Sequence, residues 1–205
     1  MSEGAPSSDA VSGDRRPAGA VVFLTGLSGS GKSTIAEALA ADLRAGGREV
    51  AIIDGDVLRQ QVSADLGYDA ASRETNIRRA AELAARFAAN GQVAITALIA
   101  PFERSRAAAR ELIEPSAPFL LVYVSTPLEL AEARDPKGLY RRARAGEILD
   151  FTGIDSPYEP PNDADLVIET AETPVAEAVR QISEALEARI GPQPERNGRR
   201  TAPSA

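Results

Sequence analysis

A glycine-rich segment at 26–33 carries the most specific chemistry in the sequence. It reads Gly-Leu-Ser-Gly-Ser-Gly-Lys-Ser and fits the pattern G-x-x-x-x-G-K-[ST] at every position. Such a loop turns backbone N–H groups around a phosphate chain, and the helix that follows adds the positive end of its dipole. We expect Lys32 to reach the β- and γ-phosphates of a nucleotide and the Ser33 hydroxyl to ligate Mg²⁺. The motif predicts nucleotide binding without choosing between a kinase, a GTPase and a motor; a glycine-rich turn with a chance lysine is the alternative.

Two carboxylates, Asp54 and Asp56, follow the next apolar run, and Arg59 comes shortly after them. Carboxylates that follow a strand beside a phosphate loop are placed for Mg²⁺-bound water and for a substrate hydroxyl. Because the chain has no histidine, a carboxylate is the expected base for an alcohol nucleophile. The alternative is that Asp56 caps the following helix, and the two roles are compatible.

Arg73 and Asn76 are three residues apart, so they would share one helix face near its N-terminus, with Ser72 as the expected cap. An arginine beside an asparagine suits an anionic acceptor that carries a ribose. A solvated charged helix face is the alternative.

Segment 134–144 carries five cations against one acid, although the whole chain has a net charge of −7. Residues 146–161 follow with little helical or strand period. We predict that 134–161 forms a mobile basic lid over the nucleotide phosphates, which would exclude the water that competes for the phosphoryl group. Lys137 and Lys32 are the two lysines of an arginine-rich chain, which favours a phosphate contact for both. A basic surface loop without function is the alternative.

Short apolar runs alternate with amphipathic stretches across residues 20–190, which predicts the elements that position these motifs. Strands are expected at 21–25, 49–54, 93–98, 119–125 and 165–169. Helices are expected at 33–45, 74–90 and 103–114, from 127 onward after a Thr126 cap, and from 175 to 190 after a Thr173 cap. Continuous apolar strands separated by helices predict an α/β fold with a mainly parallel five-stranded sheet covered on both faces. Ligands of such sheets bind beyond the carboxyl ends of the strands, where these motifs fall.

The composition excludes several classes of protein. With 205 residues and 43% hydrophobic content, the chain fits one globular domain at 20–190, flanked by disordered tails at 1–19 and 191–205. The absence of cysteine and histidine excludes disulfides, thiolate nucleophiles and the usual zinc sites, so a metal must bind through oxygen. The acidic charge argues against nucleic-acid binding. No apolar stretch reaches membrane-spanning length and the N-terminus is no secretory signal, so we expect a cytoplasmic protein.

Taken together, the motifs resemble the adenylylsulfate kinase family over about residues 20–190. The likeness is carried by GLSGSGKST at 26–34, by Asp54, Asp56 and Arg59, by LGY at 66–68, by Arg73 with NIRR at 76–79, and most specifically by RDPKGLYRRARAGEILDFTGIDSPYEPP at 134–161. The resemblance implies a P-loop kinase fold and a place in sulfate assimilation. The implied reaction is phosphorylation of the ribose 3′-hydroxyl of adenylyl sulfate by Mg-ATP, giving 3′-phosphoadenylyl sulfate.

The resemblance also implies roles for individual residues. ATP would be held by Gly26, Leu27, Ser28, Gly29, Ser30, Gly31, Lys32, Ser33, Thr34, Arg134 and Arg141. The acceptor would be bound by Asp56, Arg59, Tyr68, Arg73, Asn76, Ile99, Ala100, Lys137 and Phe151, with Tyr68 and Phe151 stacked on its adenine. Asp56 would orient or deprotonate the 3′-hydroxyl, Lys32 and Lys137 would approach the transferring phosphoryl group, and Asp54 would join Ser33 in supporting Mg²⁺. A homodimer and an ATP sulfurylase partner are further implications.

The sequence departs from the family pattern at several positions. Ala100 stands where the family often has a serine that has been proposed as a phosphorylated intermediate. Because alanine cannot carry a phosphoryl group, direct in-line transfer is the expected route. Val57, Ser72 and Tyr68 replace the more common Asn, Asp and Phe. Two alternatives stay open: a P-loop kinase for another small nucleotide or sugar alcohol, and a kinase-dead regulatory protein that binds nucleotide or adenylyl sulfate.

Overall fold

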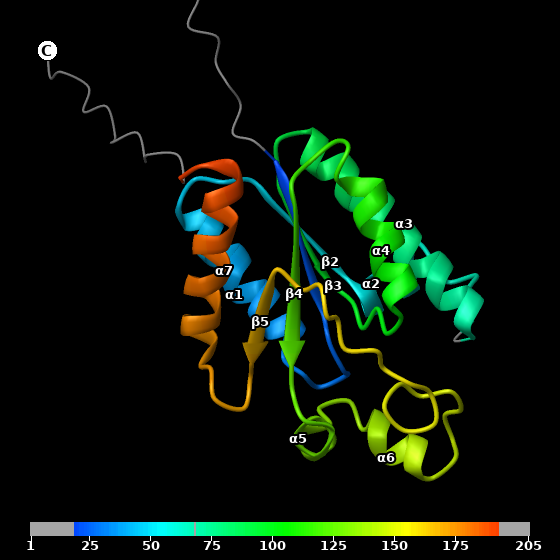
Figure 1. The fold of residues 1–205 in the computed structure, drawn as a ribbon. Coiled ribbons are helices and arrows are strands. Elements are labelled where there is room, and N and C mark those ends of the chain that lie inside the picture. The colour runs from blue at the N-terminus through cyan, green and yellow to red at the C-terminus, as the bar shows by residue number, and fades with distance from the viewer. Residues whose placement is uncertain (1–18, 68, 193–205) are drawn as a thin grey trace, which may run out of the picture.

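The computed structural model describes residues 19–67 and 69–192, in which five parallel strands form one sheet. The strand order is β2-β3-β1-β4-β5 (Figure 1), with β1 at Ala20–Thr25, β2 at Val50–Asp54, β3 at Val93–Ala97, β4 at Phe119–Ser125 and β5 at Leu166–Glu169. The register pairs Thr25 with Tyr123 and Asp54 with Ala97, so the carboxyl ends of the strands meet at one edge. The predicted α/β fold with a five-stranded parallel sheet is confirmed.

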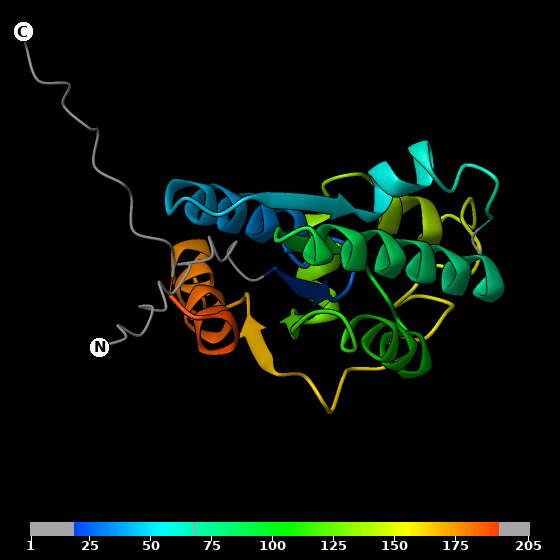
Figure 2. The same cartoon turned by 90° about the horizontal axis from the view of Figure 1, so that it is seen from above.

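Four helices cover the two faces of the sheet. Helices α1 (Lys32–Ala45) and α7 (Val175–Ile190) lie on one face, and α3 (Ala70–Ala89) and α4 (Glu103–Ile113) lie on the other (Figures 1 and 2). Three short helices lie at the carboxyl end of the sheet: α2 (Gly55–Gln61), α5 (Leu128–Arg134) and α6 (Leu139–Arg144). Successive side chains of β1 point to opposite faces of the sheet. Val22 and Leu24 pack toward α1 and α7, while Val21 and Phe23 pack toward α3 and α4.

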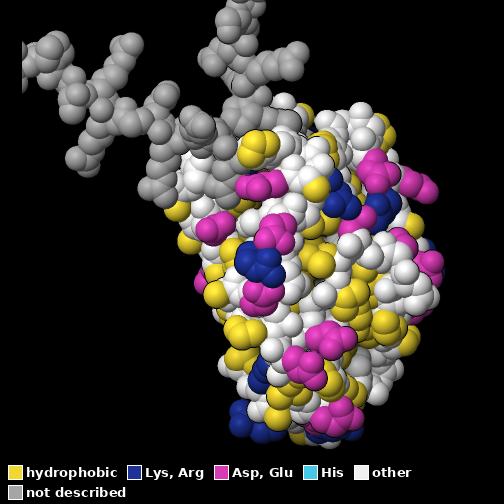
Figure 3. All heavy atoms as spheres, turned by 60° about the vertical axis from the view of Figure 1, so that its left-hand side comes forward, with side chains coloured by type: hydrophobic (Ala, Val, Ile, Leu, Met, Phe, Trp, Pro, Cys, Tyr) yellow, Lys and Arg dark blue, Asp and Glu magenta, His cyan; other side chains and the backbone are white. Residues whose placement is uncertain are grey.

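Apolar spacing in the sequence predicts one buried face with Ile35, Leu39 and Leu43 in the first helix, and one with Val175, Val179, Ile182, Leu186 and Ile190 in the last. These predicted faces are largely confirmed. Ile35, Leu39 and Leu43 of α1 are buried, as are Ile182 and Leu186 of α7. Val175 was expected on the same face of α7, but 40% of its surface is exposed, because it lies in the first turn of the helix. The outer side of α7 is charged: Arg180 pairs with both Glu177 and Glu184, and the face that carries this helix shows interspersed acidic and basic side chains (Figure 3).

The predicted start of α3 is wrong by four residues. The helix begins at Ala70 rather than at 74, and its cap is Asp69, not Ser72. The Asp69 carboxylate accepts the Ser72 N–H at 3.0 Å and the Ser72 hydroxyl at 2.6 Å. Because the first turn contributes no large apolar residue, the apolar spacing did not extend to it.

The predicted threonine caps of α5 and α7 are also wrong, as is the alternative that Asp56 caps α2. The residue that caps α2 is Asp54, whose carboxylate accepts the Asp56 N–H at 2.9 Å, so Asp56 lies inside the helix. Pro127 and Pro174 stand at the cap positions of α5 and α7, and neither helix has a side-chain cap hydrogen bond. The Thr126 hydroxyl is therefore available for other partners, described below.

The described part of the chain ends at residues 19 and 192, close to the predicted limits of the domain. The predicted tails at 1–19 and 191–205 lie almost wholly outside the described residues. Packing continues slightly past residue 190, because Arg48 Nη2 donates to the carbonyls of Gly191 and Pro192 at 2.7 and 2.9 Å. Among the helices that the structure describes, none combines the length and apolarity needed to cross a membrane.

Candidate functional site

The phosphate loop joins the carboxyl end of β1 to the N-terminus of α1. Gly29 and Gly31 have φ values of +72° and +101°, in the left-handed region that favours glycine. A Cβ on Gly29 would lie 2.8 Å from the Ala131 carbonyl oxygen of α5, so a side chain there would clash as well. Gly31, a fixed glycine of the motif, and Gly29, at one of its variable positions, therefore both meet backbone requirements of this turn.

Lys32 folds over the loop that it follows. Its Nζ donates to the carbonyls of Gly26 and Leu27 at 3.0 and 2.6 Å and to the Ser30 hydroxyl at 3.3 Å. Burial lowers the pKa of Lys32 to about 8, and the carboxylates of Asp54 and Asp56 oppose that shift. The loop thus encloses a cation that a phosphate chain would stabilise in its charged form.

Ser33 and Asp54 lie together beside the loop. The Ser33 hydroxyl donates to Asp54 Oδ2 at 2.8 Å, so the two predicted Mg²⁺ residues are in direct contact. Within 19–67 and 69–192 no group of three or more acidic side chains could hold a metal alone. A hydroxyl and a carboxylate fit Mg²⁺, which takes few protein ligands and completes its shell with phosphate oxygens and water.

Asp56 and Lys137 meet across the end of the sheet. The Lys137 ammonium donates to Asp56 Oδ2, which joins the segment after β2 to the predicted lid. This contact raises the pKa of Lys137. Asp56 and Lys137, two of the three predicted catalytic residues, are therefore paired. Asp56 raises the pKa of the third, Lys32, and Lys137 lowers it.

Arg73 reaches from α3 into the lid segment. Its Nη1 donates to the hydroxyls of Thr152 and Ser156 at 2.9 and 3.3 Å, and its Nη2 donates to the Asp150 carbonyl. Burial lowers the pKa of Arg73, and the neighbouring Arg59 cation adds to that effect. Two cations from α2 and α3 are thus held close together, which suits an anionic ligand.

The other acceptor residues predicted near α3 differ in their placement. Asn76 is buried, and its Oδ1 has no hydrogen-bond partner among the described residues. Arg59 Nη1 donates to the Gly67 carbonyl at 2.7 Å. Tyr68 lies outside the described residues, so its predicted stacking role stays a prediction.

The lid segment packs on the phosphate loop through Tyr140 and Arg134. The Tyr140 hydroxyl donates to the Ser28 carbonyl at 3.0 Å, and burial raises its pKa to about 12. Arg134 Nη1 lies 3.5 Å from the Gly29 carbonyl and 3.1 Å from Thr170 Oγ1. Arg141 donates its backbone N–H to Asp135 at 3.1 Å, in the first turn of α6. Arg134 therefore contacts the predicted donor loop directly, and Arg141 is linked to the end of α5.

Phe151 belongs to a small apolar core inside the lid. It is buried and meets Tyr140 edge-on, with ring centroids 5.0 Å apart. Ile99 and Ala100 follow β3, and their carbonyls accept from Thr25 Oγ1 at 2.6 Å and from Arg106 Nη1 at 2.8 Å. Ala100 is buried with φ +42°, a left-handed conformation that is uncommon for a residue with a side chain.

The model of one family, Adenylylsulphate kinase, matches residues 18–169. The chain belongs to this family. It is 51% identical to an adenylyl-sulfate kinase from Paraburkholderia xenovorans over 164 residues, which are 80% of this chain and 90% of that protein. It is 48% identical to a sulfate adenylyltransferase from Phaeosphaeria nodorum over 82% of this chain but 29% of that protein. The solved APS kinase CysC from Mycobacterium tuberculosis, in complex with AMPPNP and APS, is 41% identical, with a TM-score of 0.81 over 83% of this chain and 99% of that one.

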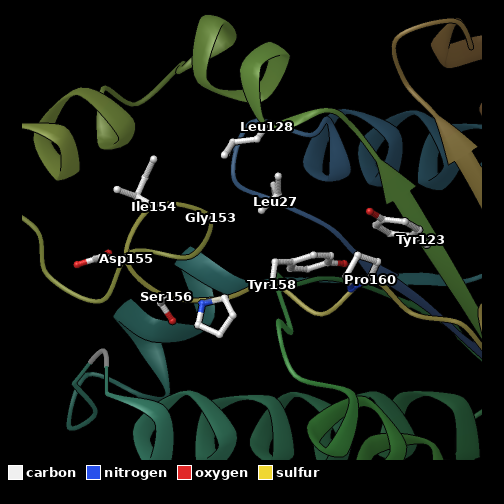
Figure 4. Close-up of a pocket in the computed structure, with 10 residues that line it drawn as sticks. Leu27, Tyr123, Leu128, Gly153, Ile154, Asp155, Ser156, Tyr158 and Pro160 are labelled. Atoms are coloured by element: carbon white, nitrogen blue, oxygen red, sulfur yellow. The ribbon is translucent and has the colours of Figure 1, made fainter.

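A cavity of about 530 Å³ lies between the phosphate loop and the lid of this adenylylsulphate kinase family member. Leu27 and Leu128 lie on one side of it and Tyr158 on the other (Figure 4). Tyr158 stacks on Tyr123 of β4 at 5.9 Å and hydrogen-bonds with Thr25 Oγ1 at 3.1 Å. Of the described residues predicted to bind ligands, Leu27 alone lines this cavity, and none of the predicted charged residues does.

Sequence reasoning missed several residues that shape the site of this family member. Tyr140 ties the lid to the loop, and its signal was an aromatic residue beside Leu139 inside a cationic segment. Thr126 and Thr170 each follow a strand directly, at the sheet edge where ligands bind. Their hydroxyl contacts had no signal in spacing, because they depend on which strands become neighbours.

Proposed function

We propose that this chain is an adenylyl-sulfate kinase, which transfers the γ-phosphoryl group of ATP to the ribose 3′-hydroxyl of adenylyl sulfate. The observation that carries the proposal is the 51% identity to the Paraburkholderia xenovorans kinase over 90% of that protein's length. The family model covers 18–169, which includes the phosphate loop and the whole lid segment at 134–161. The site geometry supports the same activity, with a cation-lined phosphate loop facing a carboxylate.

The donor would lie along the phosphate loop. Lys32 would exchange its contacts with the Gly26 and Leu27 carbonyls for the phosphates, and the N-terminus of α1 would add positive potential. Ser33 and Asp54 would hold Mg²⁺, directly or through water, since their oxygens are adjacent. When bound, the ion neutralises charge on the donor phosphates. Arg134 and Arg141 of the lid would complete the donor side.

The acceptor would lie between α3 and the lid. Arg59 and Arg73 would face the anionic phosphosulfate of this ligand. The buried Asn76 Oδ1 has no partner among the described residues and would accept from a hydrogen-bond donor elsewhere on the ligand. Asp56 Oδ2 would accept the proton of the 3′-hydroxyl while the hydroxyl oxygen forms its bond to the γ-phosphorus and the bond to ADP breaks. Lys137 would leave Asp56 for the transferring phosphoryl group, where it and Lys32 would stabilise charge. Phe151 and Tyr68 would bind the adenine, and the carbonyl groups of Ile99 and Ala100 would border it.

Direct transfer between the two ligands is part of the proposal. Ala100 stands at the position of the family's serine, and it offers no oxygen that could carry the phosphoryl group. The homodimer, the sulfurylase partner, the cytoplasmic location and the mobility of the lid stay predictions from the sequence.

The experiment is ADP release from Mg-ATP, measured with adenylyl sulfate, with other nucleotides or sugar alcohols, and with no acceptor. We expect release with adenylyl sulfate and little without it. Release with a different acceptor alone would select another P-loop kinase. Tight binding of both ligands without release would indicate a kinase-dead binding protein.

A further inference from the structure

A row of polar groups connects the base of the lid to the phosphate loop. Arg134 Nη1 lies 3.1 Å from Thr170 Oγ1. The Thr170 hydroxyl lies 2.5 Å from Thr126 Oγ1, and the Thr126 hydroxyl in turn lies 3.2 Å from the Ser30 carbonyl oxygen. The two threonines directly follow β5 and β4, which are neighbours in the sheet. Thr126 is buried, so water does not readily replace its partners.

Donor and acceptor chemistry gives this row one direction. An arginine only donates and a carbonyl oxygen only accepts, while each hydroxyl has a single hydrogen. Thr170 therefore accepts from Arg134 and donates to Thr126, which donates to Ser30. The reverse arrangement would take the Thr126 donor away from the buried Ser30 carbonyl and leave the Thr170 hydrogen only the long contact of 3.5 Å to the Ser125 carbonyl. Hydrogen bonds aligned in one direction polarise and strengthen one another.

The last bond of the row acts on the orientation of one peptide group in the phosphate loop. In a trans peptide the carbonyl and the following N–H point in opposite directions, and no described peptide bond is cis. Holding the Ser30 carbonyl toward Thr126 therefore turns the Gly31 N–H away from Thr126. Gly31 has φ +101°, and glycine lets the adjacent peptide rotate at little steric cost, so the loop alone does not fix this orientation.

We propose that Thr126 and Thr170 are positioning residues for the phosphoryl donor, whose hydroxyls transmit the placement of Arg134 to the Ser30–Gly31 peptide of the phosphate loop. The inference rests on the proposed function, because it assumes that the loop holds a nucleotide triphosphate. It assigns no contact between either threonine and a substrate.

The test is the affinity of a non-hydrolysable ATP analogue with Mg²⁺, measured by calorimetry on the full chain without acceptor. Thr126→Val keeps the side-chain shape and removes the hydroxyl, so we expect the Kd to rise about five- to tenfold, as for the loss of one or two coupled hydrogen bonds. Thr126→Ser keeps the hydroxyl and should stay within about twofold of wild type. Thr170→Val should raise the Kd by a similar factor. In the double valine variant the Kd should rise by less than the product of the two single factors, because both hydroxyls belong to the same row of hydrogen bonds.

Thr96→Val is the matched control. Thr96 is a fully buried threonine of β3 whose hydroxyl has no partner among the described residues, so its removal should leave nucleotide affinity unchanged. Affinity for adenylyl sulfate alone should stay within about twofold of wild type in every variant. A general loosening of the fold would weaken both ligands.

Three results would overturn the inference: wild-type affinity in Thr126→Val, equal weakening in Thr126→Ser, or equal loss of both ligands. If Thr126→Val does not fold, Thr170→Val carries the same expectations. If the wild-type chain fails to bind the analogue, the proposed function fails. If wild type binds and the valine variants bind equally well, the threonine row alone is wrong.

Discussion

The Lys137 ammonium contacts the Asp56 carboxylate, although the two residues lie 81 positions apart in the chain. Both side chains remain more than half exposed, at 55% and 58%. An exposed ion pair contributes only about 0–1 kcal/mol to the free energy of unfolding. The contact therefore matters less for stability than for where it holds two charges, at the end of β2 and beside the phosphate loop.

Asp56→Asn should separate chemistry from stability. The amide keeps the shape of the side chain but accepts a proton poorly, so we expect kcat for ADP release with adenylyl sulfate to fall about 10²-fold or more. The midpoint of thermal unfolding should change little, because the ion pair is exposed. Asp163→Asn, in the loop before β5, is the control and should retain wild-type kcat. Near-normal turnover in Asp56→Asn would remove Asp56 from the mechanism.

Lys32→Met tests the phosphate-loop cation. Methionine keeps most of the apolar stem but removes the charge that faces the donor phosphates. We expect kcat to fall by about 10²-fold or more, because preorganised charge supplies most of the catalysis in phosphoryl transfer. Steady-state kinetics with saturating adenylyl sulfate measures the effect. Turnover close to wild type would refute the role assigned to Lys32.

The pH dependence of nucleotide binding should follow Lys32. Burial lowers its pKa to about 8 in the free chain, and bound phosphates would favour its charged form. Below pH 8 the amine already carries its proton, so affinity should vary little with pH. Above pH 8 binding must take up a proton, and affinity should fall by up to about tenfold per pH unit.

Calorimetry in two buffers of different ionisation enthalpy detects this proton. At pH 9 the heat of analogue binding should differ between the two buffers by the amount expected for proton uptake. At pH 7 the heats measured in the two buffers should be equal. Lys32→Met should show no such difference at either pH. Equal heats for wild type at pH 9 would show that the lysine does not titrate in this range.

Ala100→Ser should change little. The position is buried, with 2% of its surface exposed, and its carbonyl is held by Arg106. We expect kcat within about twofold of wild type, since direct transfer requires no oxygen there. Intact mass after incubation with Mg-ATP should show no added phosphoryl group. A large gain in rate, or a phosphorylated chain, would establish the serine route instead.

Much of the fold follows from local sequence patterns. Apolar runs such as 119–125 and the four-residue spacing of Ile35, Leu39 and Leu43 report which side of an element is buried. The phosphate loop is equally local, because its glycines and Lys32 lie within a few residues of one another and contact the same turn. Helix ends were less predictable: Asp69 and Ser72 are both good caps, and only their contact shows which one starts α3.

Side-chain partners across the site depend on the tertiary structure. Thr126 has the local appearance of a helix cap, yet its hydroxyl contacts Ser30 and Thr170, which lie 96 and 44 residues away. Arg73 reaches Thr152 in the same way, across 79 residues. Periodicity shows which face of an element packs inward, whereas the partner of a hydroxyl or a guanidinium depends on which strands and loops are brought together. The strand order β2-β3-β1-β4-β5 makes β4 and β5 neighbours, so Thr126 and Thr170, which follow them, lie side by side at the carboxyl end of the sheet. That order arises from packing rather than from any single motif.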